Sequence, residues 1–313
     1  MKNIRYGLMM LLLGGATATF GQGDNGAALF PELTPDVRGV GMGNSGVASS
    51  ANAFSIWRNA AKNVFSDRKA EVAYSFTPWM RELASGSNLH ALAGHYQLDD
   101  KQGIQAGFRY INRPDVERAG AVYTPKDWSI DLGYARKLTE GLSVGATARF
   151  VRSALFDNAA ANGVAFDLGV YYQQAWRNND DARWSLGLQA SNFGTKMDYG
   201  YGKYKQPAKV NAGGGVDYAF NDNHRLQGTI EVGYRVWPGG CWEGAVGAEY
   251  TAFKLFSVRS GYHYGEENNR MQRYGTIGCG VHYSMLRADF AFIIPEKNSF
   301  LKNTWQVSLG VAF

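Results

Sequence analysis

The sequence predicts an all-β protein: a transmembrane antiparallel β-barrel of about 14 strands with an N-terminal plug segment. Three observations support this fold, namely an export signal at the start of the chain, strands that alternate large apolar with small or polar residues, and aromatic residues at strand ends. After residue 22 no stretch approaches the roughly 18 apolar residues that a membrane-spanning helix needs. Strands would therefore have to cross the membrane.

The composition excludes several other classes of protein. Of the 313 residues, 45% are hydrophobic, 14% aromatic and 19% charged, which is too apolar and aromatic for a disordered chain. Two cysteines are too few for a disulfide-built scaffold or a cysteine-rich zinc module. The formal net charge is only +5, and no run of basic residues indicates nucleic-acid binding.

Residues 1–21 have the features of a signal peptide. Lys2 and Arg5 form a charged start, an apolar stretch follows over 6–16, and small residues precede a cleavage site before Gln22. The mature protein is therefore expected to leave the cytoplasm. The alternative interpretation, an ordinary buried helix, fits the length and charge order of this segment less well.

The end of the chain shows the strand pattern most clearly. Large apolar residues occupy every second position: Trp305, Val307, Leu309, Val311 and Phe313. The positions between them are small or polar: Thr304, Gln306, Ser308, Gly310 and Ala312. One face of such a strand suits lipid and the other a polar lumen. A terminal aromatic resembles the insertion signal of bacterial outer-membrane barrels, so the predicted location is the bacterial outer membrane.

The same alternation recurs and gives about fourteen strands between residues 69 and 313. Val144 and Val232 fall on the lipid phase, whereas the charged residues Arg149 and Glu231 fall on the lumen phase. Connections alternate in length, and in such barrels the short turns face the periplasm and the long loops face outside. The expected outer loops include 113–126, 153–162, 192–206, 265–272 and 295–302.

Residues 22–68 do not alternate and are rich in glycine between positions 39 and 46. Irregular backbone is tolerated at membrane depth where it does not face lipid, and a fourteen-strand lumen is wide enough to hold it. The sequence therefore predicts a plug over 22–68 and a barrel over 69–313. A periplasmic tail is the alternative interpretation of this segment.

Two runs in this segment, PDVRGVGMGNSGVA at 35–48 and SIWRNAAK at 55–62, resemble the N-terminal signature of the PorV/PorQ family of outer-membrane proteins. The signature residues that we single out are Arg38, Gly41, Met42, Gly43 and Trp57. Further on, YSFTPWMR at 74–81 and YQLDDKQ at 96–102 are also similar to that family. The family's Trp-Asn-Pro is Trp-Arg-Asn here, and the chain looks short, so both PorV itself and a shorter paralogue remain open.

The resemblance implies a FadL-like barrel that serves type IX secretion. Such a protein would bind and shuttle secreted cargo through the cargo's C-terminal domain, together with a translocon or attachment-complex protein. The alternative function is a FadL-like channel for uptake of hydrophobic small molecules. Aromatic outer loops over a sealed lumen would favour protein binding, and an apolar lumen pocket with a lateral gap would favour the channel.

The candidate binding residues are Tyr199, Tyr201 and Tyr204, three aromatic side chains in the expected outer loop 192–206. Aromatic residues at such a position suit contact with a peptide. Two other roles remain open for this loop, an interfacial aromatic girdle or a loop packed on itself.

The sequence predicts no enzyme, no cofactor and no metal site. His90 and His95 are five residues apart and would face opposite sides of one strand, so they cannot share a metal. A Ser–His pair across strands, for example at His282, stays open beside a lumen-lining role. Cys241 falls on the lumen phase or in a loop and Cys279 on the lipid phase, which disfavours a disulfide.

Overall fold

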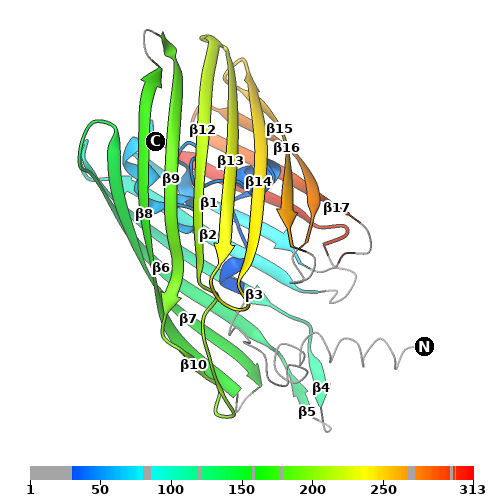
Figure 1. The fold of residues 1–313 in the computed structure, drawn as a ribbon. Helices are drawn as coiled ribbons and strands as arrows, with labels where there is room; N and C mark the ends of the chain where they lie inside the picture. Colours follow the sequence, from blue (N-terminus) through cyan, green and yellow to red (C-terminus); the bar gives the residue numbers. More distant parts are fainter. Residues whose placement is uncertain are drawn as a thin grey trace.

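The computed structural model describes residues 30–79, 86–118, 121–156, 159–176, 179–266, 272–296, 299 and 301–313. The predicted signal peptide and the first part of the predicted plug lie outside these residues. Fourteen strands form one closed antiparallel barrel, which confirms the predicted fold (Figure 1). Within the described ranges, no helix has the length and apolar character to span a membrane.

Each barrel strand pairs with its sequence neighbour in the barrel, and β1 pairs with β18 to close the cylinder. The barrel strands are β1 (Ala70–Pro78), β2 (Asn88–Gln97), β3 (Gln102–Asn112), β6 (Lys126–Lys137), β7 (Leu142–Phe156), β8 (Ala159–Trp176), β9 (Asn179–Gly194), β12 (Lys209–Asn221), β13 (His224–Arg235), β14 (Cys241–Ala252), β15 (Phe256–Gly265), β16 (Tyr274–Tyr283), β17 (Leu286–Pro295) and β18 (Trp305–Ala312). Two hairpins lie outside the barrel sheet: β4 (Val116–Arg118) with β5 (Ala121–Tyr123), and β10 (Met197–Asp198) with β11 (Lys203–Tyr204).

The two faces of the wall have the predicted polarity. Val144 and Val232 are 36% and 49% exposed, whereas Arg149 and Glu231 are buried on the inner face. The register predicted from the alternation is therefore confirmed. Large apolar side chains cover the outer surface because lipid, and not water, surrounds it.

The expected outer loop at 153–162 is wrong. β7 continues to Phe156 and β8 begins at Ala159, with Ala154 opposite Ala160 in the ladder. At its other end β8 continues to Trp176. A run of alanines hides the alternation at 159–161, because alanine marks neither the lipid phase nor the lumen phase.

The N-terminal residues 30–66, which we call the plug, lie inside the barrel (Figure 1). Four short helices make up most of the plug: η1 (Phe30–Glu32), α2 (Val37–Gly41), η2 (Ala53–Trp57) and η3 (Ala60–Phe65). Side-chain caps start two of them. Asn52 accepts from the backbone N–H of Phe54, and Asn59 accepts from that of Ala61.

The lipid face provides a first prediction. Ile230 is 66% exposed near the middle of β13, so we expect Ile230→Arg to lower the unfolding free energy by about 2–4 kcal/mol in lipid vesicles. Ala219, on the inner face of β12 at the lumen mouth, is the matched site, and Ala219→Arg should cost less. Thr229 would be a poor control because its hydroxyl lies 2.6 Å from that of Ser45 in the plug. Equal costs at residues 230 and 219 would contradict this orientation of the strands.

Candidate functional site

The glycine-rich signature lies against glycines of the barrel wall. A Cβ built on Gly247 of β14 would lie 2.2 Å from the carbonyl oxygen of Met42, and one built on Gly261 of β15 would lie 2.1 Å from the backbone nitrogen of Gly43. Gly43 also has a φ of +71°, a conformation that side chains with a Cβ rarely adopt. Glycine is needed on both sides because two backbones are in direct contact.

The same arrangement continues around the wall. Val47, Trp57 and Asn59 of the plug each lie closer than 3.0 Å to where a wall glycine would carry a Cβ. The wall glycines with this property toward the plug are Gly103, Gly107, Gly145, Gly169, Gly187, Gly213, Gly215, Gly247 and Gly261. They belong to β3, β7, β8, β9, β12, β14 and β15, so the plug is in close backbone contact with the wall from β3 round to β15.

The signature residue Arg38 attaches the plug to the wall by ionic hydrogen bonds. Its guanidinium donates to both carboxylate oxygens of Glu249, at 2.7 and 2.8 Å, and to the side-chain oxygens of Ser50 and Gln227. Burial alone would lower the pKa of Arg38, but Glu249 raises it above its usual value. Glu249 also pairs with Arg259 on the next strand, so the contact is part of a network in the wall.

Two further polar contacts hold the signature loop. The carboxylate of Glu231 accepts from the backbone N–H groups of Gly46 and Val47, at 2.7 and 2.9 Å. On β16, the hydroxyl of Thr276 accepts from Gly43 N–H and donates to the carbonyl of Gly41. The plug backbone is therefore bonded to inward side chains of the wall, which replace the water that it would otherwise need.

A second network of charged side chains lies on the inner face of strands β3, β6, β7 and β8. Asp131, Arg149 and Asp167 face inward on β6, β7 and β8, and Arg149 pairs with both carboxylates. Arg109 on β3 lies 3.5 Å from Asp131. Asp167 also accepts from the backbone N–H of Asn192, where β9 shifts register against β8.

Arg109 connects this network to the plug. Its guanidinium donates to the carbonyl of Pro31 at 3.0 Å and lies 5.0 Å from the ring centroid of Trp57 and 5.6 Å from that of Phe30. Contacts of this kind between a cation and aromatic rings stabilise buried arginine. The signature residue Trp57 thus lies at the contact between plug and wall. Sequence reasoning missed Arg109, because only the strand register, which pairs Arg109 with Ser129, brings it diagonally next to Asp131.

Lys62 of the plug is fully buried and provides a prediction of pH dependence. Its ammonium donates to the carbonyl of Gly46 and to the hydroxyl of Ser49, and burial lowers its pKa to about 7. The unfolded chain would bind this proton up to a pH of about 10, so the unfolding free energy should rise with pH between these values, by at most about 1.4 kcal/mol per unit. Lys62→Met should lack this rise in urea unfolding in detergent. An unchanged pH slope would exclude Lys62 as its source.

A vestibule opens at the barrel end that carries the short turns. It is a cavity of about 810 Å³ whose floor is formed by the plug residues Arg38, Ser50, Asn52 and Phe54. Its walls are the ends of the strands, which carry charges of both signs. In outer-membrane barrels the short-turn end faces the periplasm. The plug residues at the floor of the vestibule therefore face that compartment.

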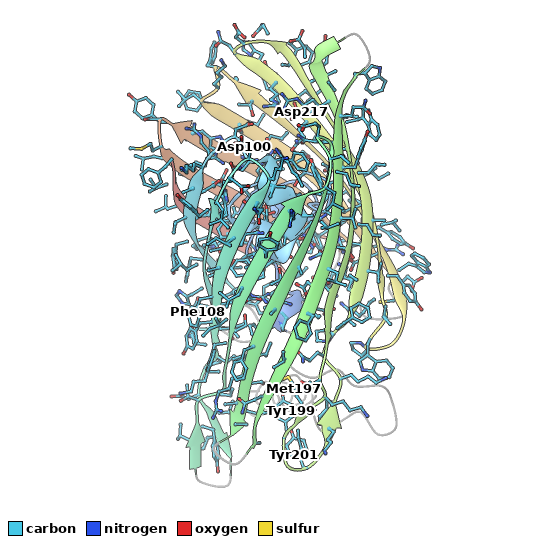
Figure 2. The ribbon with its side chains drawn as sticks, turned by 90° about the vertical axis from the view of Figure 1, so that its left-hand side faces the viewer. Asp100, Phe108, Met197, Tyr199, Tyr201 and Asp217 are labelled. Atoms are coloured by element: carbon cyan, nitrogen blue, oxygen red, sulfur yellow. The ribbon has the colours of Figure 1, made fainter. Side chains whose placement is uncertain are left out.

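The three predicted tyrosines come together on the β10–β11 hairpin. Figure 2 shows two of them, Tyr199 and Tyr201, at the other end of the barrel. The ring centroids of Tyr199 and Tyr201 are 6.0 Å apart, and those of Tyr199 and Tyr204 are 5.9 Å apart. Tyr199 is only 4% exposed and packs with the buried Met197 in an apolar cluster inside the mouth. Tyr201 is 52% exposed. The loop is thus packed on the barrel at its base and exposed at its tip.

Other reactive side chains lie as the strand phases predicted. His90 is in ring contact with Tyr74, while His95 is buried on the inner face. Cys241 is buried and Cys279 is exposed, and both are free. His282 lies 3.8 Å from Asp289 on the neighbouring strand. Among the described side chains, no group of three or more His, Cys, Asp or Glu is placed to hold a metal ion.

Comparison with known proteins gives one family and one fold. A family model described as type IX secretion system protein PorV matches residues 25–240, more than half of the chain. The structure is similar to the CymD monoaromatic hydrocarbon channel, with a TM-score of 0.59, 14% identity, and coverage of 91% of this chain and 97% of that one. It is also similar to the P. putida toluene transporter TodX, with a TM-score of 0.58, 12% identity, and coverage of 88% of this chain and 97% of that one. The Ralstonia pickettii toluene transporter TbuX gives a TM-score of 0.55, 13% identity, and coverage of 90% and 97%. No curated protein matches the chain. At these identities the structural likeness shows the fold alone.

Proposed function

This chain belongs to the family of the type IX secretion system protein PorV, and from that premise we propose that it binds secreted cargo or a secretion partner at the outer mouth of its barrel. It is a β-barrel of the bacterial outer membrane, as the alternation and the terminal aromatic predicted. The proposed activity is protein handling without covalent chemistry.

The choice of the β10–β11 hairpin as the binding surface rests on one observation. The β10–β11 hairpin presents the exposed ring of Tyr201 above Tyr199, whose ring is packed into the mouth. A tyrosine held on a packed base loses little freedom when it binds, and aromatic residues of this kind dominate the affinity of many protein interfaces. This supports Tyr201, with Tyr204 beside it, as the anchor for a partner.

The way the plug fills the barrel favours a protein-handling role and disfavours an open channel. Its backbone fits wall glycines on strands around the barrel and is bonded to inward carboxylates such as Glu231 and Glu249. A solute would have to displace these contacts to cross the lumen. A partner that docks on the outer hairpins would leave them in place.

A hydrophobic small-molecule channel is the second candidate. The apolar cluster inside the outer mouth favours it, and the similar structures are described as hydrocarbon channels or toluene transporters. In this chain the cluster is filled by its own side chains, which include Phe30, Leu89, Ile111 and Met197. A ligand would have to replace one of them.

The test compares two exposed outer-loop residues. We expect Tyr201→Ala to weaken capture of a purified C-terminal cargo domain by roughly tenfold, which corresponds to about 1.4 kcal/mol. Val122→Ala is the matched control, because Val122 is 65% exposed in the β4–β5 hairpin at the same end of the barrel. Heat-modifiable gel mobility would show that both variants assemble. Equal capture by both variants, together with uptake of a labelled hydrophobic compound, would favour the channel.

A further inference from the structure

Three basic side chains gather on the lipid-facing side of the wall, at the outer end of β6, β7 and β8. We call them the basic patch: Lys126, Arg152 and Lys196, all of which are exposed. Arg152 faces outward, because both of its neighbours in β7 are buried on the lumen side. It lies opposite Trp128 in the ladder, and Lys126 is two residues away from Trp128 on the same strand. Lys126 and Arg152 are therefore close together on one face of the wall.

Asn162 on β8 lies between Arg152 and the chain that carries Lys196. It is opposite Arg152 in the ladder, and its amide oxygen accepts from the Arg152 guanidinium at 3.1 Å. Two residues further along β8, the carbonyl of Val164 accepts from the backbone N–H of Thr195, the residue before Lys196, at 2.9 Å. Arg152 is thus held against the outside of the wall, and its other N–H groups have no partner among the described residues.

The charges of the basic patch are not neutralised by the protein. Within the part of the chain that the structure describes, none of its three side chains forms an ion pair. Asp127, the carboxylate next to Lys126 in the sequence, is buried on the lumen side and pairs with Arg113 at 2.6 Å. In the same row of the ladder as Lys126, the outward residues of β2 and β3 are the uncharged Asn88 and Asn112. Exposed cations without partners favour an anionic ligand at this part of the rim.

The basic patch lies at the level of lipid headgroups. Beside it, the rings of Trp128 and Phe150 are in contact, with centroids 5.5 Å apart, and aromatic residues at strand ends mark the membrane interface. From this level toward the middle of the membrane, Val164, Phe166 and Leu168 on β8 are 37%, 57% and 64% exposed, which suits contact with acyl chains. The vestibule is at the opposite, periplasmic end of the barrel, so the basic patch faces the outer leaflet.

We propose that the basic patch binds the phosphate groups of a glycolipid in the outer leaflet, with the acyl chains along the apolar outer face of β7 and β8. The outer leaflet of bacterial outer membranes typically consists of phosphorylated glycolipid. A guanidinium can form two parallel hydrogen bonds with a phosphate, and nearby ammonium groups add to the attraction. This site is separate from the binding of a partner by Tyr201. Because Lys196 directly precedes β10, the glycolipid would be bound beside the hairpin that carries Tyr201.

Lipid A with and without its phosphates tests the site. Native mass spectrometry of the protein in detergent would measure binding of bisphosphorylated lipid A and of the same lipid after dephosphorylation. We expect the wild type to bind the bisphosphorylated form about tenfold more tightly, and the double variant Lys126→Gln with Arg152→Gln to lose this preference. The matched control is Lys101→Gln with Arg136→Gln, which removes the same two charges from exposed positions at the short-turn end of the barrel. This control should keep the preference.

Three results would overturn the proposal. The first is equal binding of the two lipids by the wild type, and the second is an unchanged preference in the double variant at residues 126 and 152. The third is equally tight binding of phosphatidylglycerol, because the basic patch would then not select a glycolipid. Tyr201→Ala should leave lipid binding unchanged, so failure of this proposal can be distinguished from failure of the proposed function.

Two single variants keep the proposal testable if the double variant does not assemble. Arg152→Lys retains the charge and should keep most of the preference for the phosphorylated lipid. Lys196→Gln changes an exposed residue outside the barrel strands and should lower the preference about threefold. A preference that Lys196→Gln leaves unchanged would overturn the basic patch as the site.

Discussion

Replacing Arg149 with methionine is expected to lower the unfolding free energy by about 3–5 kcal/mol, because the change leaves two buried carboxylates without their shared cation. Arg149 is 3% exposed and pairs with Asp131 on β6 and Asp167 on β8. Its loss would also remove the donor to the side chain of Asn192 at the register shift of β9. Denaturant unfolding in detergent micelles, followed by tryptophan fluorescence, measures the change.

The control for this variant is an ion pair in solvent. Arg225 pairs with Asp217 near the short-turn end, and the side chain of Arg225 is 47% exposed. Arg225→Met should therefore cost less than about 1 kcal/mol. The double variant Arg149→Met with Asp167→Asn should recover part of the loss, since it removes one of the uncompensated charges. If the variants at 149 and 225 unfold alike, the inner network does not hold the wall together.

The two phases of the strands could be predicted from the sequence because lipid imposes a single rule on every second residue. The rule fails where residues are small on both faces, as in the alanines at 159–161, and β8 is therefore longer than predicted. The alternation does not predict which residues of neighbouring strands lie opposite each other. Arg149 is predicted as an inward charge, but only the register of β6 against β7 shows that Asp131 lies opposite it.

The signature of the plug could be located in the sequence, but its physical role depends on residues far along the chain. Arg38 and Gly43 were visible as part of a motif, while their partners Glu249 and Gly261 lie more than 200 residues away. The high glycine content has the same explanation. Many of these glycines are on the lumen phase of strands, where the plug leaves no room for a Cβ.

Tyr199, Tyr201 and Tyr204 show a limit of a different kind. Composition predicted an aromatic outer loop and left open whether it binds a partner or packs on itself. In the structure Tyr199 packs on the barrel and Tyr201 stays exposed, so one loop contains both environments. Only the fold separates the packed ring from the exposed one: Tyr199 directly follows β10 and packs in the cluster with Met197, whereas Tyr201 lies further along the connection between β10 and β11.

Adding a methyl group at Gly247 is expected to displace the plug, whereas the same change at Gly244 on the same strand should be tolerated. The new Cβ of Gly247→Ala would lie 2.2 Å from the carbonyl oxygen of Met42 and 2.6 Å from its Cβ, so the signature loop must move. At the outward-facing Gly244, the nearest atom to a new Cβ is 3.8 Å away. Overpacking of this kind costs about 1–3 kcal/mol in a well-packed core.

Protease sensitivity and conductance measure this displacement together. For Gly247→Ala we expect faster cleavage within the signature loop and openings in planar bilayers, because a displaced plug exposes a water-filled lumen. A variant that lacks residues 22–62 sets the conductance of the unplugged barrel, and Gly244→Ala should match the wild type in both assays. Gly247→Ala and Gly244→Ala each add one methyl group to β14, the first on its inner face and the second on its outer face. Contact with the plug is therefore what distinguishes the two variants. Indistinguishable behaviour of the two variants would mean that the signature does not seat on the wall glycines.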